Sequence, residues 1–281
     1  MTVLPESHAD GYETVYRDFD SPLMRQIWRE AYCEDIGQHS GVSAEEVRAD
    51  IRRLALTPAG RSLDLGCGPC GPLAFVVAEL GCHGTGIEIS RSALQVGRGR
   101  AAALGIESLP SIQQGDLNEA LPFVATTFDA AVAIDVVLHF RNRAEFFQHV
   151  RRLLSNGGRF LITDAGAVTG GLTNEEIRRR SVHGHTQFVA PRWNERLIFN
   201  AGPRLIEYED RTISSLTVAL ARLGALLAHR VELEGLSGAA AVAAQQEYLE
   251  VVVDLSQRKA LSRVMYLAEV EATTPVSVAD E

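Results

Sequence analysis

Three glycines at a fixed spacing form the first pattern in this chain that indicates chemistry. Gly66, Gly68 and Gly71 make a G-x-G-x-x-G turn in LDLGCGPCG, directly after an apolar run typical of a strand. Glycine lets the backbone approach a ligand closely, and the amide groups at the start of a following helix bind phosphates and other polar groups. Because glycine is also common in ordinary loops, the residues at the other strand ends must decide what this turn does.

Carboxylates stand beside the turn and at the expected ends of the next two strands. Glu88 ends the second expected strand, at a distance from the turn that suits an acid accepting hydrogen bonds from both hydroxyls of a ribose. Asp116 ends the third, where a carboxylate can accept from the exocyclic amine of adenine while Leu117 packs on the ring. The alternative is that Glu88 and Asp116 face solvent, and that Asp64, in the first strand, only accepts from nearby backbone or loop donors.

An acid and a histidine follow the fourth expected strand in AIDVVLHF. Asp135 and His139 are four residues apart, so a helical turn there would bring both side chains onto one face. Histidine suits a general base because its unperturbed pKa is close to a neutral working pH. The spacing therefore predicts that His139 is a base oriented by Asp135. The alternative, that His139 only packs and bonds locally, stays open.

Two cysteines occupy variable positions of the glycine turn. Cys67 and Cys70 form a C-x-x-C, but no second C-x-x-C or H-x-x-x-H follows to complete a metal site. The four cysteines of the chain are also too few and too scattered for a disulfide framework. We therefore expect no metal ion, and we give a redox role of the pair little weight.

Length and charge limit the class of protein. The chain has 281 residues, of which 46% are hydrophobic and 22% charged, fractions typical of a globular protein with a sizeable core. A formal net charge of -9 opposes binding to nucleic acid, because that binding depends on basic side chains that neutralise phosphates. With no run of about 18 apolar residues and no signal-peptide pattern, we expect a cytoplasmic protein that binds no membrane. Whether it forms a homo-oligomer is left open.

Strands and helices alternate through the middle of the chain. Stretches with apolar residues at helical spacing separate most of the strand candidates, which cover residues 62–65, 84–89, 111–114, 130–134 and 159–163. This alternation predicts a parallel sheet covered by helices on both faces. Two capped helices precede it, because Ser21 stands before Pro22, and Ser43 stands three residues before Glu46.

The pattern changes after residue 164. Two short helices, a strand, two long Ala- and Leu-rich helices and a last strand are predicted in turn, over residues 173–181, 194–202, 203–210, 214–234, 238–258 and 261–272. Because the long helices lie between strand candidates, we expect them to form a cap over the carboxyl edge of the sheet. The run Arg178, Arg179 and Arg180 is typical of a solvated helix face.

The N-terminal segment is rich in aromatic residues. Tyr12, Tyr16, Trp28 and Tyr32 fall within residues 11–41, at a density that the rest of the chain lacks. A segment of this kind has little reason to be so aromatic unless it closes over something. We therefore expect a lid that becomes ordered when a ligand binds.

Taken together, these motifs make the chain resemble the class I S-adenosylmethionine-dependent methyltransferases. The resemblance rests on LDLGCGPCG, GIEIS, GDL, AIDVVLHF and LLSNGGRFLITD; it covers roughly residues 30–165 in order and continues more weakly to the end. It implies an α/β fold with a Rossmann-like, seven-stranded, mostly parallel sheet, an antiparallel last strand, a helical N-terminal lid and a helical cap. The chain is accordingly divided into a lid (1–58), a cofactor-binding core (59–165), and cap helices with the last strands (166–281).

The resemblance also implies S-adenosylmethionine as the cofactor and assigns residues to it. Gly66 and Gly68 approach its methionine part, Glu88 binds the ribose, and Asp116 with Leu117 frames the adenine. The full set of cofactor-binding residues that it implies is Asp64, Gly66, Gly68, Glu88, Ile89, Asp116, Leu117 and Asp135.

Within this family the chain looks most similar to small-amine and phosphobase N-methyltransferases. YCEDIGQHSG loosely matches their lid segment G-E-N/D-x-I-x-x-G, although Cys33 stands where those enzymes have glycine. Their lid tyrosine that partners the histidine falls near Phe19 of this chain, so we expect Tyr16 to take that role beside His139 and Asp135.

The acceptor side of the site departs from that subgroup. His183 and His185 stand where phosphobase enzymes place Arg and Tyr on the substrate phosphate, which disfavours a phosphobase. Trp28 is assigned to the same substrate side, with a place in the core as its alternative. The sequence does not choose among an amine, a phenol, a carboxylate or a carbon nucleophile from specialised metabolism.

Three functions follow from these patterns. The first is methyl transfer from S-adenosylmethionine to a small-molecule acceptor at nitrogen, oxygen or carbon. The second is an oxidoreductase linked to NAD, which is disfavoured by Asp64 before the first glycine and by the lack of an obvious second, substrate-binding domain. The third is a protein with the same fold that acts as a non-catalytic partner subunit.

Overall fold

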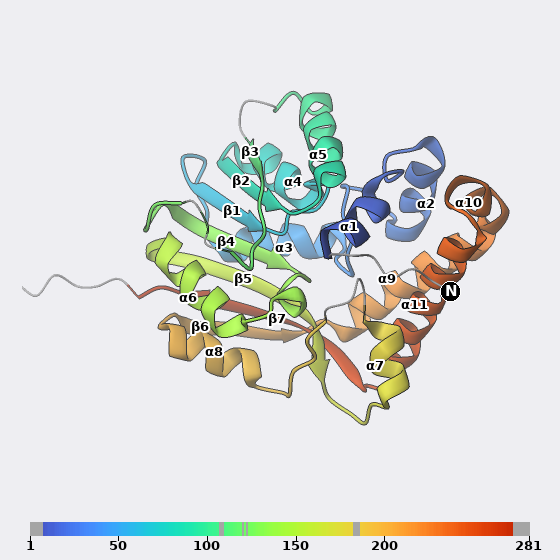
Figure 1. Cartoon of the computed structure of the whole chain (residues 1–281). Coiled ribbons are helices and arrows are strands. Elements are labelled where there is room, and N and C mark those ends of the chain that lie inside the picture. Colours follow the sequence, from blue (N-terminus) through green and yellow to red (C-terminus); the bar gives the residue numbers. More distant parts are fainter. Residues whose placement is uncertain (1–7, 107–109, 120, 122, 182–185, 272–281) are drawn as a thin grey trace, which may run out of the picture.

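The computed structural model describes residues 8–106, 110–119, 121, 123–181 and 186–271. One seven-stranded sheet runs through the molecule, with helices along its faces and a further group of helices beyond one of its edges (Figure 1). This arrangement confirms the predicted α/β class and the Rossmann-like sheet.

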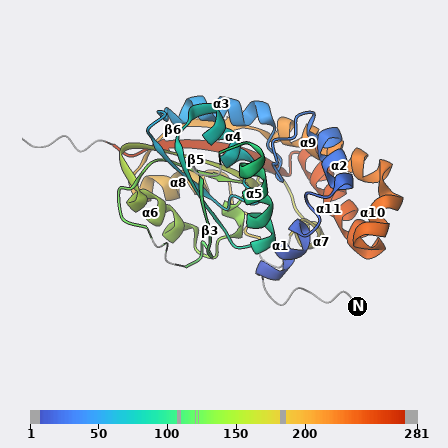
Figure 2. The ribbon, with the colours of Figure 1, turned by 90° about the horizontal axis from the view of Figure 1, so that it is seen from above.

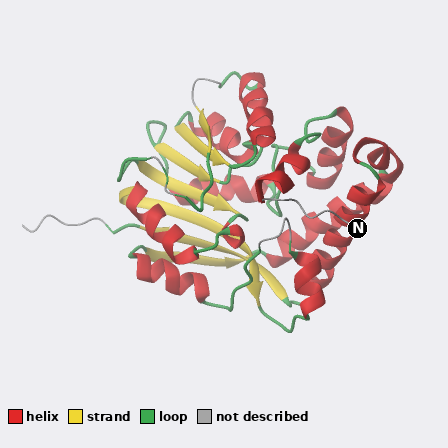
Figure 3. Ribbon diagram, in the orientation of Figure 1, coloured by secondary structure: helices red, strands yellow, loops and turns green. Residues whose placement is uncertain are grey.

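The sheet has the strand order β3-β2-β1-β4-β5-β7-β6. Its strands are β1 (Arg61–Leu65), β2 (His83–Glu88), β3 (Pro110–Gln114), β4 (Phe128–Ile134), β5 (Leu154–Val168), β6 (Arg204–Asp210) and β7 (Leu261–Glu269). Strands β1 to β5 pair in parallel, whereas β7 runs antiparallel to both of its neighbours. The predicted antiparallel last strand is confirmed, and the carboxyl ends of the parallel strands share one edge (Figure 3).

Helices cover the two faces of the sheet with separate apolar cores. One face packs against α6 (Arg143–Leu153) and α8 (Trp193–Ala201) through residues such as Phe147 and Ile198. The opposite face packs against α3 (Ala44–Leu54), α4 (Gly71–Leu80) and α5 (Arg91–Ala103). Seen from above, α3 lies on one side of the sheet and α6 on the other (Figure 2).

The remaining helices gather beyond the carboxyl edge of the sheet (Figure 1). They are α1 (His8–Tyr16), α2 (Pro22–Tyr32), α7 (Asn174–Arg180), α9 (Thr212–Ala228), α10 (Arg230–Ser237) and α11 (Ala239–Gln257). The N-terminal lid helices and the cap helices share an apolar core of their own, in which Tyr16 and Trp28 join Val218 and Leu249. The predicted helical lid and helical cap are therefore confirmed as parts of the fold.

Local signals begin α2 and α3 where the sequence predicts them. Ser21 and Ser43 accept hydrogen bonds from the backbone amides of Met24 and Glu46, as N-caps do. The single helix predicted over 214–234 is wrong, because it breaks at His229 into α9 and α10, which differ in direction by 82°. The imidazole of His229 lies 2.8 Å from the carboxylate of Glu30 on α2, so this break is held by the lid.

Within the described ranges no single helix is both long and apolar enough to cross a membrane. Among the described helices, α9 and α10 reach that length and composition only when taken together, and they form a bent pair.

Candidate functional site

The first two glycines of the turn occupy backbone conformations that favour glycine. Gly66 has a φ of 78° and Gly68 a φ of 53°, both in the left-handed region. A Cβ atom on Gly66 would lie 2.5 Å from a methyl carbon of Val136, and one on Gly68 would lie 3.0 Å from the hydroxyl of Tyr16. The amides of Gly66 and Cys67 donate to the carbonyl of Ile87, which fixes the turn at the end of β1. Both glycines line a cavity at the carboxyl edge of the sheet.

The third glycine, Gly71, allows a close contact between the lid and the core. A Cβ atom on Gly71 would lie 2.3 Å from the carbonyl carbon of Gly37 and 2.4 Å from the carbonyl oxygen of Ile36. The absence of a side chain therefore lets the lid backbone pack directly on the start of α4. The G-x-G-x-x-G spacing combines a ligand-facing turn with a contact between lid and core.

Glu88 is buried in the cavity wall and is tied to the turn. One carboxylate oxygen accepts from the amide of Gly68 at 3.0 Å, and the other accepts from the amides of Ile89 and Ser90 at 2.9 and 3.0 Å. Burial raises the pKa of Glu88, and these backbone amides oppose the rise. A carboxylate can accept about four hydrogen bonds, so this fixed group keeps capacity for a ligand hydroxyl.

Asp64 is buried beside the turn with an unsatisfied oxygen. Its side chain is 2% exposed, and its Oδ1 has no hydrogen-bond partner among the described residues. Burial, together with the negative charge of Glu88, raises the pKa of Asp64 to about 7. Of the two interpretations left open for Asp64, simple satisfaction by nearby donors is wrong for this oxygen. A ligand that brings a positively charged donor would satisfy it.

Asp116 and Leu117 follow β3 and line the same cavity, as does Ile89 after β2. The Oδ1 of Asp116 accepts from the backbone amide of Asn118 at 2.8 Å and from its side-chain amide at 3.0 Å. These bonds fix the carboxylate at the cavity wall. Leu117 is half-buried against the sheet core, so the loop after β3 combines one acceptor with one apolar surface.

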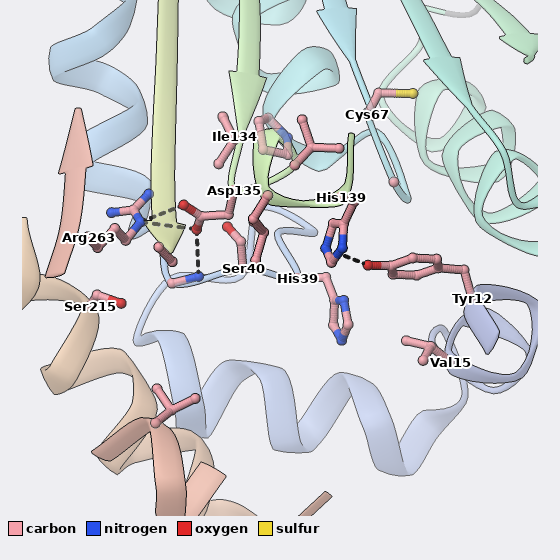
Figure 4. Close-up of a pocket in the computed structure, with 18 of the residues that line it drawn as sticks. Tyr12, Val15, His39, Ser40, Cys67, Ile134, Asp135, His139, Ser215 and Arg263 are labelled. Carbon is pink, nitrogen blue, oxygen red and sulfur yellow. Dashed lines mark hydrogen bonds and ion pairs between the residues drawn. The ribbon is translucent and has the colours of Figure 1, made fainter. Parts of the chain in front are cut away.

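Asp135 is engaged away from His139, contrary to the prediction. Its carboxylate accepts from Nε of Arg263 at 2.8 and 3.0 Å, from the hydroxyl of Thr163 at 2.7 Å and from the amide of Gly41 at 3.2 Å (Figure 4). Burial raises its pKa, but the charge and hydrogen bonds of Arg263 outweigh this and keep the pKa below its usual value. Asp135 therefore holds β7 and the lid at the cavity.

The physical reason lies in the backbone after β4. Asp135 has a φ of 53°, in the left-handed region, and a short 3-10 helix follows only over Val137–His139. The predicted helical turn, which would place Asp135 and His139 on one face, is therefore absent between these two residues.

His139 instead pairs with a lid tyrosine. The hydroxyl of Tyr12 lies 2.8 Å from Nε2 of His139 (Figure 4). Burial, and the charge of Glu88, raise the pKa of Tyr12, so the phenol keeps its proton and can donate it to the imidazole. The assignment of this role to Tyr16 is wrong in register: Tyr16 lies one helical turn further on, stacked on Tyr12 with ring centroids 6.2 Å apart, and lines the cavity beside Gly68.

Trp28 lies in the core, which was its alternative. Its side chain is 7% exposed, its indole donates to the carbonyl of Phe19 at 3.1 Å, and it is not among the cavity-lining residues that the structure describes. The guanidinium of Arg222 lies 5.8 Å from its ring centroid and does line the cavity. His183 and His185 lie outside the described residues.

The C-x-x-C pair is a packing feature. Both thiols are free and buried, with their sulfur atoms 3.4 Å apart. The hydrogen bond with Cys70 and burial raise the pKa of the Cys67 thiol, which disfavours the reactive thiolate. In the part of the chain that the structure describes, no group of three or more His, Cys, Asp or Glu side chains could hold a metal ion.

Tyr12 and Arg180 are among the cavity residues that escaped the sequence analysis. Tyr12 was noted only as a lid aromatic, and its spacing of four from Tyr16 puts both on one helix face, so spacing could not choose between them. Arg180 was taken for a solvated residue, yet it is 5% exposed and lines the cavity. Helical periodicity within the arginine run was the one signal that could have singled it out.

The fold and the site together indicate the general class of this protein. A glycine turn after β1, a buried acid after β2 and a second acid after β3, all at the carboxyl edge of a parallel sheet, are typical of α/β proteins that bind a nucleoside cofactor. The chain belongs to the family described as "Methyltransferase domain", whose model matches residues 56–196.

Curated relatives agree with this family. Methyltransferase GfsG of Streptomyces halstedii is 30% identical over 164 residues, which are 56% of this chain and 58% of that protein. The (+)-O-methylkolavelool synthase of Herpetosiphon aurantiacus is 27% identical over 177 residues, which are 58% of this chain and 62% of that protein. The matches thus span about three fifths of the length of these relatives.

Solved structures share the fold over almost the whole chain. The cyclopropane synthase MmaA2 of Mycobacterium tuberculosis has a TM-score of 0.77 at 15% identity and covers 96% of this chain and 100% of its own. The (4+2)-cyclase SpnF has a TM-score of 0.74 at 19% identity and covers 97% of this chain and 98% of its own. At such identities the likeness establishes the fold alone.

The family supports S-adenosylmethionine as the cofactor, and the residues of the turn fit this molecule. The unsatisfied oxygen of buried Asp64 suits an ammonium group, and the remaining capacity of Glu88 suits a ribose hydroxyl. The left-handed glycines line the cavity and present their backbone to it. Charge and hydrogen-bonding capacity therefore agree with an amino acid joined to a nucleoside.

Proposed function

We propose that the protein transfers a methyl group from S-adenosylmethionine to a small-molecule acceptor. One observation carries this proposal: a single cavity is lined both by the cofactor-type residues Asp64, Gly68 and Glu88 and by the Tyr12–His139 pair. A methyl transfer needs the acceptor held close to the methyl group in a site that excludes water, with a base when the acceptor carries a proton.

The cofactor side of the cavity binds and orients. When bound, S-adenosylmethionine supplies a methyl group made electrophilic by its sulfonium. We assign its ammonium group to Asp64, its ribose to Glu88 with Ile89 alongside, and its adenine to Asp116 and Leu117. Asp135 acts through Arg263 and Gly41, whose bonds set the position of the lid at this side of the cavity.

Tyr12 and His139 form the proposed base. The protonated phenol of Tyr12 donates to Nε2 of His139. As the acceptor loses its proton, the phenol oxygen takes that proton up and passes its own to Nε2. The imidazole becomes positively charged, and the acceptor atom keeps the electron pair of its broken bond to hydrogen. With the cofactor bound, that pair would form the bond to the methyl carbon, and the sulfur would keep the pair of the broken S–C bond. Tyr16, stacked on Tyr12, positions the pair rather than taking part.

Two alternatives stay as outcomes of a test. An oxidoreductase linked to NAD disagrees with the family and with Asp64 before the first glycine. A non-catalytic or differently catalytic role is a real competitor, since a structure named as a (4+2)-cyclase has the same fold. Titrating the protein with S-adenosylmethionine and with NAD, followed by a screen of amines, phenols, acids and carbon nucleophiles with labelled methyl donor, separates the three.

Single-turnover transfer then tests the base. His139→Ala should lower the rate about 10²-fold or more and change its pH profile, because a base acts in the transition state, while affinity for S-adenosylhomocysteine stays nearly the same. Tyr12→Phe should lower the rate as well. His149→Ala, on α6 outside the cavity lining, is the matched control. Absence of cofactor binding and of labelled product contradicts the proposal, whereas a wild-type rate in His139→Ala removes only the base.

Location and assembly stay predictions from the sequence. We propose a cytoplasmic enzyme whose partner is its small-molecule substrate, without nucleic acid or membrane. Fractionation of cells and light scattering of the purified protein test these points, and the second also gives the oligomeric state.

A further inference from the structure

The three arginines at the end of α7 differ in their surroundings. Arg178 is exposed and pairs with Glu175 at 2.5 Å on its own helix. Arg179 pairs with Glu247 at 2.8 Å and so joins α7 to α11. Arg180 points the other way and is buried, with 5% of its surface exposed, in the wall of the cavity.

The guanidinium of Arg180 is incompletely satisfied. One terminal nitrogen donates to the carbonyl of Ala165 at 3.4 Å, and the group lies 5.3 Å from the ring centroid of Tyr248. Its other terminal nitrogen, NH1, is buried without a hydrogen-bond partner, and no carboxylate within the described ranges pairs with it. A buried cation without an anionic partner is costly, so its retention at a cavity wall indicates that a ligand supplies the anion.

Charge is divided across this cavity. The carboxylates of Asp64, Glu88 and Asp116 lie after β1, β2 and β3, on the cofactor side. Arg263 is neutralised by Asp135 and Glu46. Arg180 binds the end of β5, which β4 separates from the glycine turn after β1. Its free donors therefore lie on the side of the cavity away from the turn, which the cofactor residues leave for the acceptor.

We propose that Arg180 binds an acidic group of the methyl acceptor, so that the acceptor is a small organic acid. This inference rests on the proposed function. A guanidinium presents its donors in a planar fork that matches the paired oxygens of a carboxylate, phosphate or sulfonate. Tyr248 holds the fork by its ring face, and Ala165 holds it at one nitrogen, which leaves NH1 for the ligand. The methionine carboxylate of the cofactor is the alternative anionic group that would bind Arg180.

Binding to the protein loaded with S-adenosylhomocysteine tests the proposal. The probes are 4-hydroxybenzoate, 3-phenylpropanoate and hexanoate, each compared with its primary amide, which has nearly the same shape but no charge. At least one acid should bind 10-fold or more tightly than its amide. This preference should fall close to one in Arg180→Gln and Arg180→Met and persist in Arg178→Gln, the matched control on the same helix. No acid binding more tightly than its amide, including the case in which none binds, overturns the proposal.

Two further measurements exclude other roles of Arg180. The melting temperature of the ligand-free Arg180→Met protein should equal or exceed that of the wild type, because an unpaired buried charge is removed; a clear fall shows a structural role and overturns the proposal. Affinity for S-adenosylhomocysteine should be unchanged in Arg180→Gln, and a loss assigns the arginine to the cofactor carboxylate instead. If the wild-type protein does not bind S-adenosylhomocysteine, the proposed function itself fails, which is a different result.

Discussion

At the scale of single residues, the carboxylate of Asp64 is in an unfavourable environment in the ligand-free protein. It is buried, one of its oxygens lacks a partner among the described residues, and its pKa is raised to about 7 by burial and by Glu88. A carboxyl group whose pKa is raised on folding stabilises the folded state when protonated, and this contribution is lost as the pH rises toward 7. Near neutral pH the site is therefore held in a destabilised form that a cationic ligand would relieve.

Asp64→Asn should consequently stabilise the ligand-free protein while weakening the cofactor. The free energy of unfolding of the variant minus that of the wild type should be about 2 kcal/mol larger at pH 8 than at pH 5. The wild type loses this stability because Asp64 ionises between the two pH values, and one pKa unit corresponds to about 1.4 kcal/mol. Affinity for S-adenosylhomocysteine should fall by about tenfold or more. Denaturant unfolding at the two pH values and calorimetry measure both, with Asp254→Asn on the surface of α11 as control. Equal pH dependence in variant and wild type contradicts the assignment.

Individual residues were predictable to different degrees. Glu88, Asp116 and the two left-handed glycines could be found because a strand end fixes where the next side chain lies. The partners of Asp135 could not be found, since Arg263 is 128 residues away and comes from β7. A pair that distant follows from the sheet order, which local spacing does not encode.

At the scale of elements, the carboxylate of Glu13 attaches α1 to the start of α5. The carboxylate of Glu13 accepts from the backbone amides of Arg91 and Ser92, at 2.5 and 3.0 Å, at the start of α5. It acts as a capping group supplied by another helix and adds a negative charge at the positive end of the α5 dipole. The lid helix that carries Tyr12 is thus positioned by the same helix that begins after β2.

Glu13→Gln should loosen this helix. The amide keeps one acceptor oxygen but loses the charge, so the amides of α1 should exchange hydrogen several-fold faster, and unfolding should become easier by about 1 kcal/mol. Single-turnover transfer should slow because Tyr12 is less well placed beside His139. Arg17→Gln, an exposed change just after the same helix, is the control. Unchanged exchange over α1 would show that apolar packing alone holds it.

Helices and strands were predicted correctly where the hydrophobic periodicity was long. They were predicted wrongly where the backbone changes direction within such a pattern. The alternation of strands and helices up to β5 and the capped helices agreed with the structure, because each is set by local periodicity. The break at His229 was missed, since an apolar helical pattern runs straight across it. The end of β4 was misjudged for a related reason: a left-handed Asp135 leaves no trace in a hydrophobic pattern.

At the scale of the whole molecule, a buried polar network joins the lid, the sheet and the last strand. Arg263 on β7 donates to Asp135 after β4 and to Glu46 on α3, while Gly41 of the lid donates to Asp135. Removing one member of a buried ion pair leaves the other uncompensated, which typically costs about 3–5 kcal/mol.

Asp135→Asn should therefore lower the free energy of unfolding by about 3–5 kcal/mol. The double variant Asp135→Asn, Arg263→Met should lose less than the sum of Asp135→Asn and Arg263→Met, because neither partner of this pair is then left alone, while Glu46 keeps Arg211 at 3.9 Å. Denaturant unfolding of the single and double variants measures the difference. If the losses of the single variants simply add, the two residues do not act as a pair, and the role given to Asp135 is wrong.

The separation of the lid-and-cap core from the apolar cores of the sheet sets the expected motion of the molecule. Lid helices α1 and α2 lie beside α9 and α11 of the cap (Figure 1) and pack with them in a core separate from those of the sheet. The cavity is lined by residues from both parts. A ligand that touches both sides should stabilise lid and cap as one unit, because local opening of either exposes the shared core. Hydrogen exchange with S-adenosylhomocysteine bound should therefore slow over Pro22–Tyr32 and over Thr212–Ala228 together, while the amides of β4 and β5 change little. Slowing confined to the glycine turn would mean that the lid and cap do not respond to the cofactor, and that only the acceptor closes them.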